Sequence, residues 1–191
     1  MSSVIKIKPS GTAFVESSHA TKNFSSLKKL YTGSLHTSPS NTVMFKTLVK
    51  FDPGMLYELP VESAYLCFYV KEINNESSFY SNNNFCIYKN EELFNIDTVT
   101  WNTTPRTSCA FPFLIDNDSI KHYAKINITT YVSDWICNGN NFGITIEPQN
   151  YYSSLVKFAS VNSDNSPWLL IKYKAPSAVV NGKGRLCKSS L

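Results

Sequence analysis

The sequence lacks the short motifs that mark common catalytic and metal sites. Its five cysteines form no CxxC pair and its three histidines no HxxxH pair, so a local zinc site is not expected. It has no GxSxG elbow, no Walker-type phosphate loop and no GxGxxG fingerprint. Carboxylates cluster only in predicted turns and strand ends, where they usually face water; these are Glu58 with Glu62, Glu91-Glu92, and Asp116 with Asp118. We therefore expect no enzyme activity, no cofactor and no transition-metal site.

Long apolar runs and basic stripes are also missing. No run is long enough to cross a membrane, and the start, MSSVIKIKPSG, lacks the apolar core of a secretory signal. Either a signal has been removed or the protein is made without one. Lys and Arg number 18 against 14 Asp and Glu, and these basic residues are scattered outside the C-terminal tail. We expect neither membrane insertion nor a nucleic-acid partner.

Alternation of apolar and polar residues, which is typical of β-strands, runs through much of the sequence. Val43 to Phe51 has one clearly apolar face, and the Asp52-Pro53-Gly54 turn ends it. Val61 to Lys71 is mostly apolar on both faces, which places it near the centre of a sheet. Further strands are expected at 4–8, 12–16, 29–32, 85–88, 143–147, 156–159 and 168–174, and around Trp101.

Only one segment has clear helical spacing. Its apolar stripe consists of Ile128, Val132, Trp135 and Ile136. Asn127 can cap the start, and Asn138-Gly139 supplies a left-handed stop. Many short strands with one helix predict an all-β fold, a jelly-roll-like antiparallel β-sandwich whose end the helix closes. At 191 residues we expect an extended arm at 1–12, one sandwich at 13–174 and a basic tail at 175–191.

The cysteines fall into two groups. Those inside the predicted sandwich are expected to be small buried hydrophobic residues; they are Cys67, Cys86, Cys109 and Cys137. Cys187 lies in the polar tail, where it should be exposed. It is a candidate for an intermolecular disulfide, although an idle tail thiol is an equally good interpretation.

Five segments occur in an order and spacing that resemble a known family. They are KTLVKFDP (46–53), ELPVESAYLCFYV (58–70), DTVTWNTTP (97–105), ITTYVSDWICNGNNFGITIEP (128–148) and SPWLLIKY (166–173). Together they resemble the DNRLRE family of bacterial and archaeal surface domains from about Ala13 to Tyr173. The resemblance implies a non-catalytic jelly-roll sandwich similar to carbohydrate-binding modules, found in large secreted proteins.

The first functional hypothesis is a structural subunit of a bacterial surface assembly, such as a spore coat, an appendage or a filament. Sandwich edges accept added strands, so both chain ends could pair with other copies of the chain. The candidate contact residues are Val4, Ile5, Ile7, Ala178, Val179 and Val180. This hypothesis places the protein at the cell or spore surface without a recognisable secretion signal.

The alternative hypothesis is a carbohydrate-binding module for adhesion or polysaccharide targeting. Aromatic rings in polar loops would stack on sugars, and the candidates are Phe79, Tyr80, Tyr151 and Tyr152. These rings could instead fold back over the sandwich ends, because exposed aromatic clusters are costly. Asp116-Asn117-Asp118 and Asp164-Asn165 could hold a structural calcium, but ordinary turns are the favoured interpretation.

Overall fold

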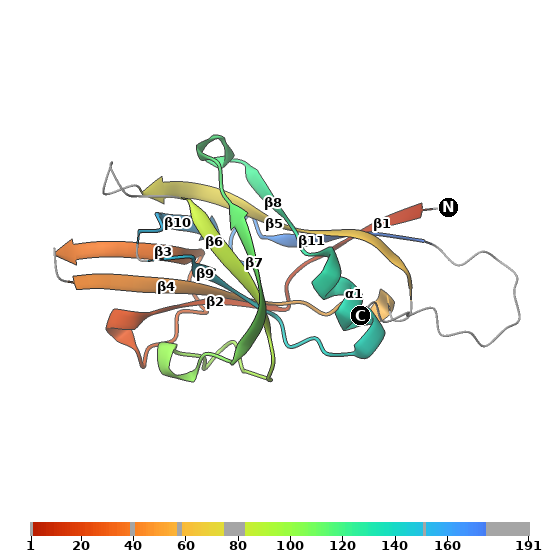
Figure 1. Cartoon of the computed structure of the whole chain (residues 1–191), viewed down its shortest axis with the longest axis horizontal. Coiled ribbons are helices and arrows are strands. Elements are labelled where there is room, and N and C mark those ends of the chain that lie inside the picture. Colours follow the sequence, from red (N-terminus) through yellow and green to blue (C-terminus); the bar gives the residue numbers. More distant parts are fainter. Residues whose placement is uncertain (1, 39–40, 57–58, 75–82, 151, 175–191) are drawn as a thin grey trace, which may run out of the picture.

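The computed structural model describes residues 2–38, 41–56, 59–74, 83–150 and 152–174 (Figure 1). Within these residues the protein has one α-helix, α1 (Thr129–Asn138), and eleven strands. The strands are β1 (Ser2–Ile7), β2 (Gly11–Glu16), β3 (Lys29–Ser38), β4 (Asn41–Lys50), β5 (Val61–Asn74), β6 (Asn84–Asn90), β7 (Thr107–Leu114), β8 (Tyr123–Asn127), β9 (Ile144–Pro148), β10 (Leu155–Ala159) and β11 (Trp168–Lys174).

The strands form one curled antiparallel sheet whose two limbs face each other. The first limb contains β1, β11, β5 and β8, and the second contains β2, β3, β4, β9, β6 and β7. Strand β10 joins the limbs, because it pairs with β3 along one edge and with the end of β5 along the other. Every strand pair is antiparallel. The predicted antiparallel β-sandwich with one short helix is confirmed.

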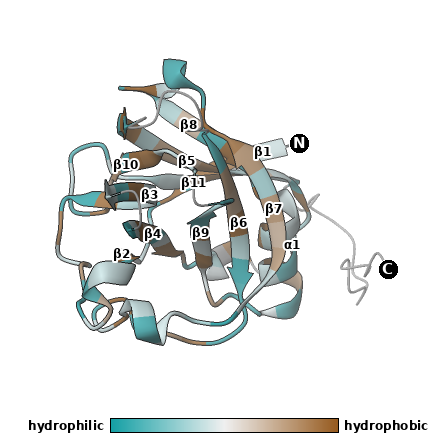
Figure 2. Ribbon diagram, turned by 60° about the vertical axis from the view of Figure 1, so that its left-hand side comes forward, coloured by the Kyte–Doolittle hydropathy of each residue, from teal (hydrophilic) through white to brown (hydrophobic). Residues whose placement is uncertain are grey.

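Side-chain alternation decides which residues of each strand face the space between the limbs. In β5, Leu66 and Phe68 are fully buried there, whereas Tyr65 and Tyr69 point away and are half-buried. Successive strand residues point to opposite faces, so bands of hydrophobic and hydrophilic residues follow one another along the chain (Figure 2). The resulting core is filled mainly by β-branched and aromatic side chains from both limbs. Its fully buried members include Leu30, Val49, Phe85, Ile87, Ile144, Val156, Phe158, Leu169 and Ile171.

Helix α1 connects the two limbs at one end of the sandwich. Thr129 accepts a hydrogen bond from the Ala64 amide of β5 at 2.9 Å, and the Tyr131 hydroxyl donates to the Ile87 carbonyl of β6 at 3.0 Å. Tyr131 also donates to the carbonyl of Cys109 in β7. The predicted left-handed stop is present, since Gly139 has φ 71°. At the start of the helix the N-cap position is Ile128, and the preceding Asn127 Oδ1 accepts a hydrogen bond from the Thr129 amide.

A second, smaller hydrophobic cluster lies outside the second limb. Ala13 and Val15 of β2 and Leu48 of β4 point away from the main core and are fully buried. They are covered by the segment 91–106, in which Val99 is buried and Phe94, Ile96 and Trp101 pack against the cluster. We call this segment the cover. It hides the apolar outward side chains of one limb from water.

Three predictions of local structure were wrong. Trp101 begins a 3-10 turn, η3 (Trp101–Thr103), rather than lying in a strand, because Thr100 and Thr103 form a reciprocal capping box there. Strands β7 and β8 were not predicted. The open edge strand β7 leaves Cys109 exposed, and Cys137 is half-buried and disulfide-bonded, so two internal cysteines are not small buried core residues.

Candidate functional site

The outward side of the first limb carries aromatic side chains that no other segment of the described chain buries completely. Tyr65 and Tyr69 come from β5, Tyr123 from β8 and Trp168 from β11, and all four are half-buried. Strand pairing brings them together, because Tyr69 lies opposite Tyr123 and Trp168 lies opposite Cys67, two residues before Tyr69. We call these four residues the aromatic face.

Three rings of the aromatic face, those of Tyr69, Tyr123 and Trp168, form a row across three strands. The centroids of Tyr123 and Trp168 are 3.8 Å apart, and those of Tyr69 and Tyr123 are 5.3 Å apart in an edge-on arrangement. Cys67 is fully buried beneath this row although it points outward. Mutual packing holds the rings in fixed orientations, so they lose little rotamer freedom if a ligand settles on them.

Lysines surround the aromatic face. Lys6 of β1 lies 4.7 Å from the centroid of the Trp168 ring, and Lys125 of β8 lies opposite Cys67 and is exposed. Lys172 of β11 forms a 2.9 Å ion pair with Glu62. Within the part of the chain that the structure describes, no ion pair neutralises Lys6 or Lys125. The face therefore combines flat apolar surface with net positive charge.

Two titratable groups in this face, Tyr123 and Cys67, stay uncharged near neutral pH. Burial raises the pKa of the Tyr123 phenol, and the nearby Tyr69 phenol raises it further. Burial also raises the pKa of the Cys67 thiol, although the Lys125 charge opposes that shift. Both groups are neutral in their protonated forms, so the positive charge of the lysines is not offset by them.

Of the predicted sugar-stacking residues, only Tyr152 falls within the described residues. It is 53% exposed and its ring lies 6.3 Å from the His36 ring, away from the aromatic face. Phe79, Tyr80 and Tyr151 lie outside the described residues, and so do Ala178, Val179, Val180 and Cys187.

Strand β1 contains the remaining predicted contact residues. It pairs with β11 of the same chain from Ser2 to Ile7, so one of its two edges is already occupied. Ile5 and Ile7 pack against the main core, whereas Val4 is 62% exposed. Any pairing with another copy would have to use the second edge of this strand.

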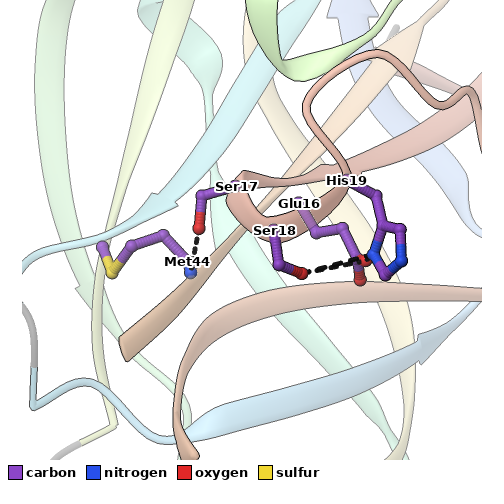
Figure 3. Close-up of polar contacts among 5 residues, drawn as sticks. All are labelled: Glu16, Ser17, Ser18, His19 and Met44. Carbon is purple, nitrogen blue, oxygen red and sulfur yellow. Dashed lines mark hydrogen bonds and ion pairs between the residues drawn. The ribbon is translucent and has the colours of Figure 1, made fainter. Parts of the chain in front are cut away.

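A surface cluster near the end of β2 contains Glu16, Ser18 and His19, residue types that occur in catalytic triads (Figure 3). The Ser18 hydroxyl lies 3.3 Å from His19 Nδ1, and the Glu16 carboxylate contacts the same nitrogen. A triad needs the carboxylate and the nucleophile on opposite ring nitrogens. Glu16, Ser18 and His19 therefore form a local surface network rather than a catalytic triad. The neighbouring Ser17 hydroxyl accepts a hydrogen bond from the Met44 amide at 2.9 Å.

No metal-binding group emerges from the described ranges. No three His, Cys, Asp or Glu residues there are arranged to hold a metal ion. Asp116 precedes η4 (Asn117–Ser119) and Asp118 lies within it; both are exposed, and Asn117 accepts a hydrogen bond from Asn83 at 3.0 Å. None of the helices described there is long and apolar enough to span a membrane.

The aromatic face was missed because its members are separated in sequence and half-buried. Each was assigned to a strand by alternation, and alternation does not say whether an outward face is covered. One signal was present: β5 is apolar on both faces, which predicted a position near the centre of the sheet. The structure agrees, because β5 pairs with β8, β10 and β11. Its outward face is partly open, and the aromatic residues there form the surface.

Comparison with models of protein families shows to which family the chain belongs. The profile of carbohydrate-binding module family 96 matches residues 3–173, which is most of the sequence, and the chain belongs to this family. The match agrees with the predicted likeness to carbohydrate-binding modules, a class that is typically non-catalytic, and the finer resemblance to the DNRLRE family stays a prediction. No curated protein matches the chain.

Proposed function

We propose that this protein binds polysaccharide without modifying it, and that the aromatic face is the binding surface. One observation carries this proposal: a row of fixed aromatic rings lies on a sheet face that the described chain leaves partly open. The axial C–H groups of a pyranose ring pack well on such flat rings. Membership of carbohydrate-binding module family 96 supports the same function.

The lysines favour an acidic polysaccharide over a neutral one. The Lys6 ammonium lies beside the Trp168 ring, and Lys125 lies opposite Cys67 and acts electrostatically on its thiol. Neither lysine has a carboxylate partner among the described residues. A uronic-acid carboxylate placed next to a stacked sugar ring would give each lysine a partner. Partly desolvated charge pairs of this kind contribute to specificity more than to affinity.

Native affinity electrophoresis tests the proposal. The protein is run through gels that contain polygalacturonate, polymannuronate, hyaluronan or neutral glucans, and acidic polymers should retard it most. Trp168→Ala should weaken the retardation strongly, because loss of an aromatic anchor costs about 2 kcal/mol, roughly thirtyfold in affinity at this face.

Tyr152→Ala is the matched control, since it removes an exposed aromatic ring from the loop near His36. It should leave retardation unchanged. If Tyr152→Ala abolishes binding and Trp168→Ala does not, the loop is the site and the aromatic face is not. Lack of retardation in every gel would contradict carbohydrate binding itself.

The role of structural subunit at a cell or spore surface stays a prediction, and the family match favours carbohydrate binding over it. It could be tested by electrophoresis of native material with and without reductant. A dimer band that disappears on reduction would support covalent pairing of copies. A monomer in both lanes would contradict that pairing.

A further inference from the structure

A shallow hollow lies on the outward side of the second limb, where the cover meets the sheet. It has a volume of about 280 Å³ and is lined by Ser10, Gly11, Lys50, Phe94, Asn95 and Ile96. Lys50 points away from the main core, like Leu48 two residues earlier in β4. The hollow and the aromatic face are therefore on opposite outer sides of the sandwich.

Lys50 gives the hollow its chemical character. Its Nζ donates to the Phe94 carbonyl at 2.9 Å and lies 5.0 Å from the centroid of the Phe94 ring. An ammonium group has three donors, so two remain after this bond. Among the described residues, no carboxylate forms an ion pair with Lys50. The charge is held in place at the wall of the hollow without an anionic partner.

The remaining lining groups are suited to a sugar. Ser10 and Asn95 are exposed and carry a hydroxyl and an amide, which can exchange hydrogen bonds with ring hydroxyls. Phe94 and Ile96 supply apolar surface and are anchored in the second hydrophobic cluster. Asp97 follows this segment but does not line the hollow. Small-ligand sites begin at roughly 300 Å³, so the volume suits one sugar unit rather than a long chain.

We propose that this hollow is a second glycan-binding site, specific for a single acidic sugar unit whose carboxylate pairs with Lys50. The inference rests on the proposed function and extends it, because the protein then binds glycan on two opposite faces. The two sites lie on opposite outer faces of the sandwich, so a short oligosaccharide would have to bend around an edge of the sheet to reach both. A long polymer chain bound at one face leaves the other free for a second chain, and the protein would cross-link polysaccharide.

Calorimetric titration with tetragalacturonate and tetramannuronate tests this inference, after light scattering has confirmed a monomer. Wild type should bind two equivalents of the better tetrasaccharide. Ser10→Tyr fills the hollow from an exposed position, and Lys50→Gln removes its charge; each should reduce binding to one equivalent. Trp168→Ala should also leave one equivalent. Lys28→Gln, the same charge change at an exposed lysine outside both sites, should keep two.

Turbidity of mixtures with polygalacturonate or polymannuronate gives an independent readout. Wild type and Lys28→Gln should cross-link the polymer, and each single-site variant should not. If wild type binds one equivalent and Ser10→Tyr and Lys50→Gln leave that equivalent unchanged, the second site is overturned while binding at the aromatic face stands. If wild type binds no glycan, both this inference and the proposed function are overturned.

Discussion

The two outer faces of the sandwich differ in whether their apolar side chains are covered by another segment of the chain. On the second limb, the outward residues Ala13, Val15 and Leu48 lie under the cover and are excluded from water. On the first limb, the outward residues Tyr65, Tyr69, Tyr123 and Trp168 stay half-exposed. Apolar residues on the outside of a sheet thus serve stability where a segment covers them, and they remain available to a ligand where none does.

Aliphatic and aromatic residues divide between the faces accordingly. The sheet contributes small and branched side chains to the covered cluster, and the cover packs Phe94, Ile96 and Trp101 against them. The open face uses mainly rings, which combine large apolar area with a polar hydroxyl or indole N–H that tolerates water. The difference predicts that equivalent substitutions have different consequences on the two faces.

The largest expected effect is on stability. Leu48→Ala should lower the free energy of unfolding by roughly 2–5 kcal/mol, because it leaves a cavity at a fully buried position. Leu170→Ala, on the outward and half-buried side of β11, should cost much less. Urea titration of both variants measures the two values, and equal losses would show that the cover does not distinguish the faces.

Alkaline titration probes the core that both faces share. The Tyr131 phenol titrates near pH 10 in the unfolded chain, whereas burial raises its pKa to about 12 in the folded protein. The unfolded state releases this proton first, so the stability contributed by neutral Tyr131 is present below pH 10 and is lost as the pH rises toward 12. The loss should reach roughly 3 kcal/mol at most.

Tyr131→Phe isolates this contribution. The variant lacks the hydroxyl that donates to Ile87 and Cys109, so it should be less stable at neutral pH by about 1–2 kcal/mol. It should also show a shallower fall in stability between pH 10 and 12 than wild type or Tyr152→Phe. An identical fall in all three proteins would assign the alkaline transition to other groups.

Substitutions in the aromatic face should weaken ligand binding and change the stability of the protein little. Tyr123→Leu removes the central ring of the row, which contacts both Trp168 and Tyr69. Affinity for the best polysaccharide should fall about tenfold, the equivalent of roughly 1.4 kcal/mol. The thermal midpoint should change by only a few degrees. A large drop in the midpoint with unchanged affinity would make the row part of the core rather than a surface for ligands.

The smallest effect is electrostatic. Lys6→Gln should weaken binding of uronic-acid polymers a few-fold at low salt, because exposed charges contribute about 0.5–1 kcal/mol. The difference from wild type should shrink as ionic strength rises, since salt screens exposed charges. Neutral glucans should bind both proteins equally. A loss that persists in high salt would mean that Lys6 acts by packing on Trp168 rather than through its charge.

Local patterns were sufficient to predict the strands that contain clear alternation, including β4, β5 and β11. They also located α1, whose apolar stripe and left-handed Gly139 are both encoded within a few residues. Strand β7 was missed because Cys109-Ala110-Phe111-Pro112 does not alternate and contains a proline. An edge strand tolerates both features, since one row of the β7 backbone groups has no strand partner among the described residues.

The candidate site depends on long-range pairing, which alternation does not reveal. Tyr69 and Tyr123 are far apart in sequence and become neighbours only through the β5–β8 register. At Trp101 a local pattern was misleading. A tryptophan among β-branched residues predicted a strand, but Trp101 lies in a 3-10 turn and packs against the second cluster. Whether an outward ring is covered depends on where the connecting segments run, and their course is set by the whole fold.

The position of strand β10 between the two limbs determines how the molecule should respond to a pulling force. Its five residues hold the edge of β3 on one side and the end of β5 on the other, so one backbone ladder links the limbs. Opposing pulls on the two outer faces would be transmitted along this ladder as well as through the soft packing of the core. The limbs should therefore resist sliding past each other, and yielding should begin at the irregularity between Lys157 and Phe158, where the pairing with β5 shifts.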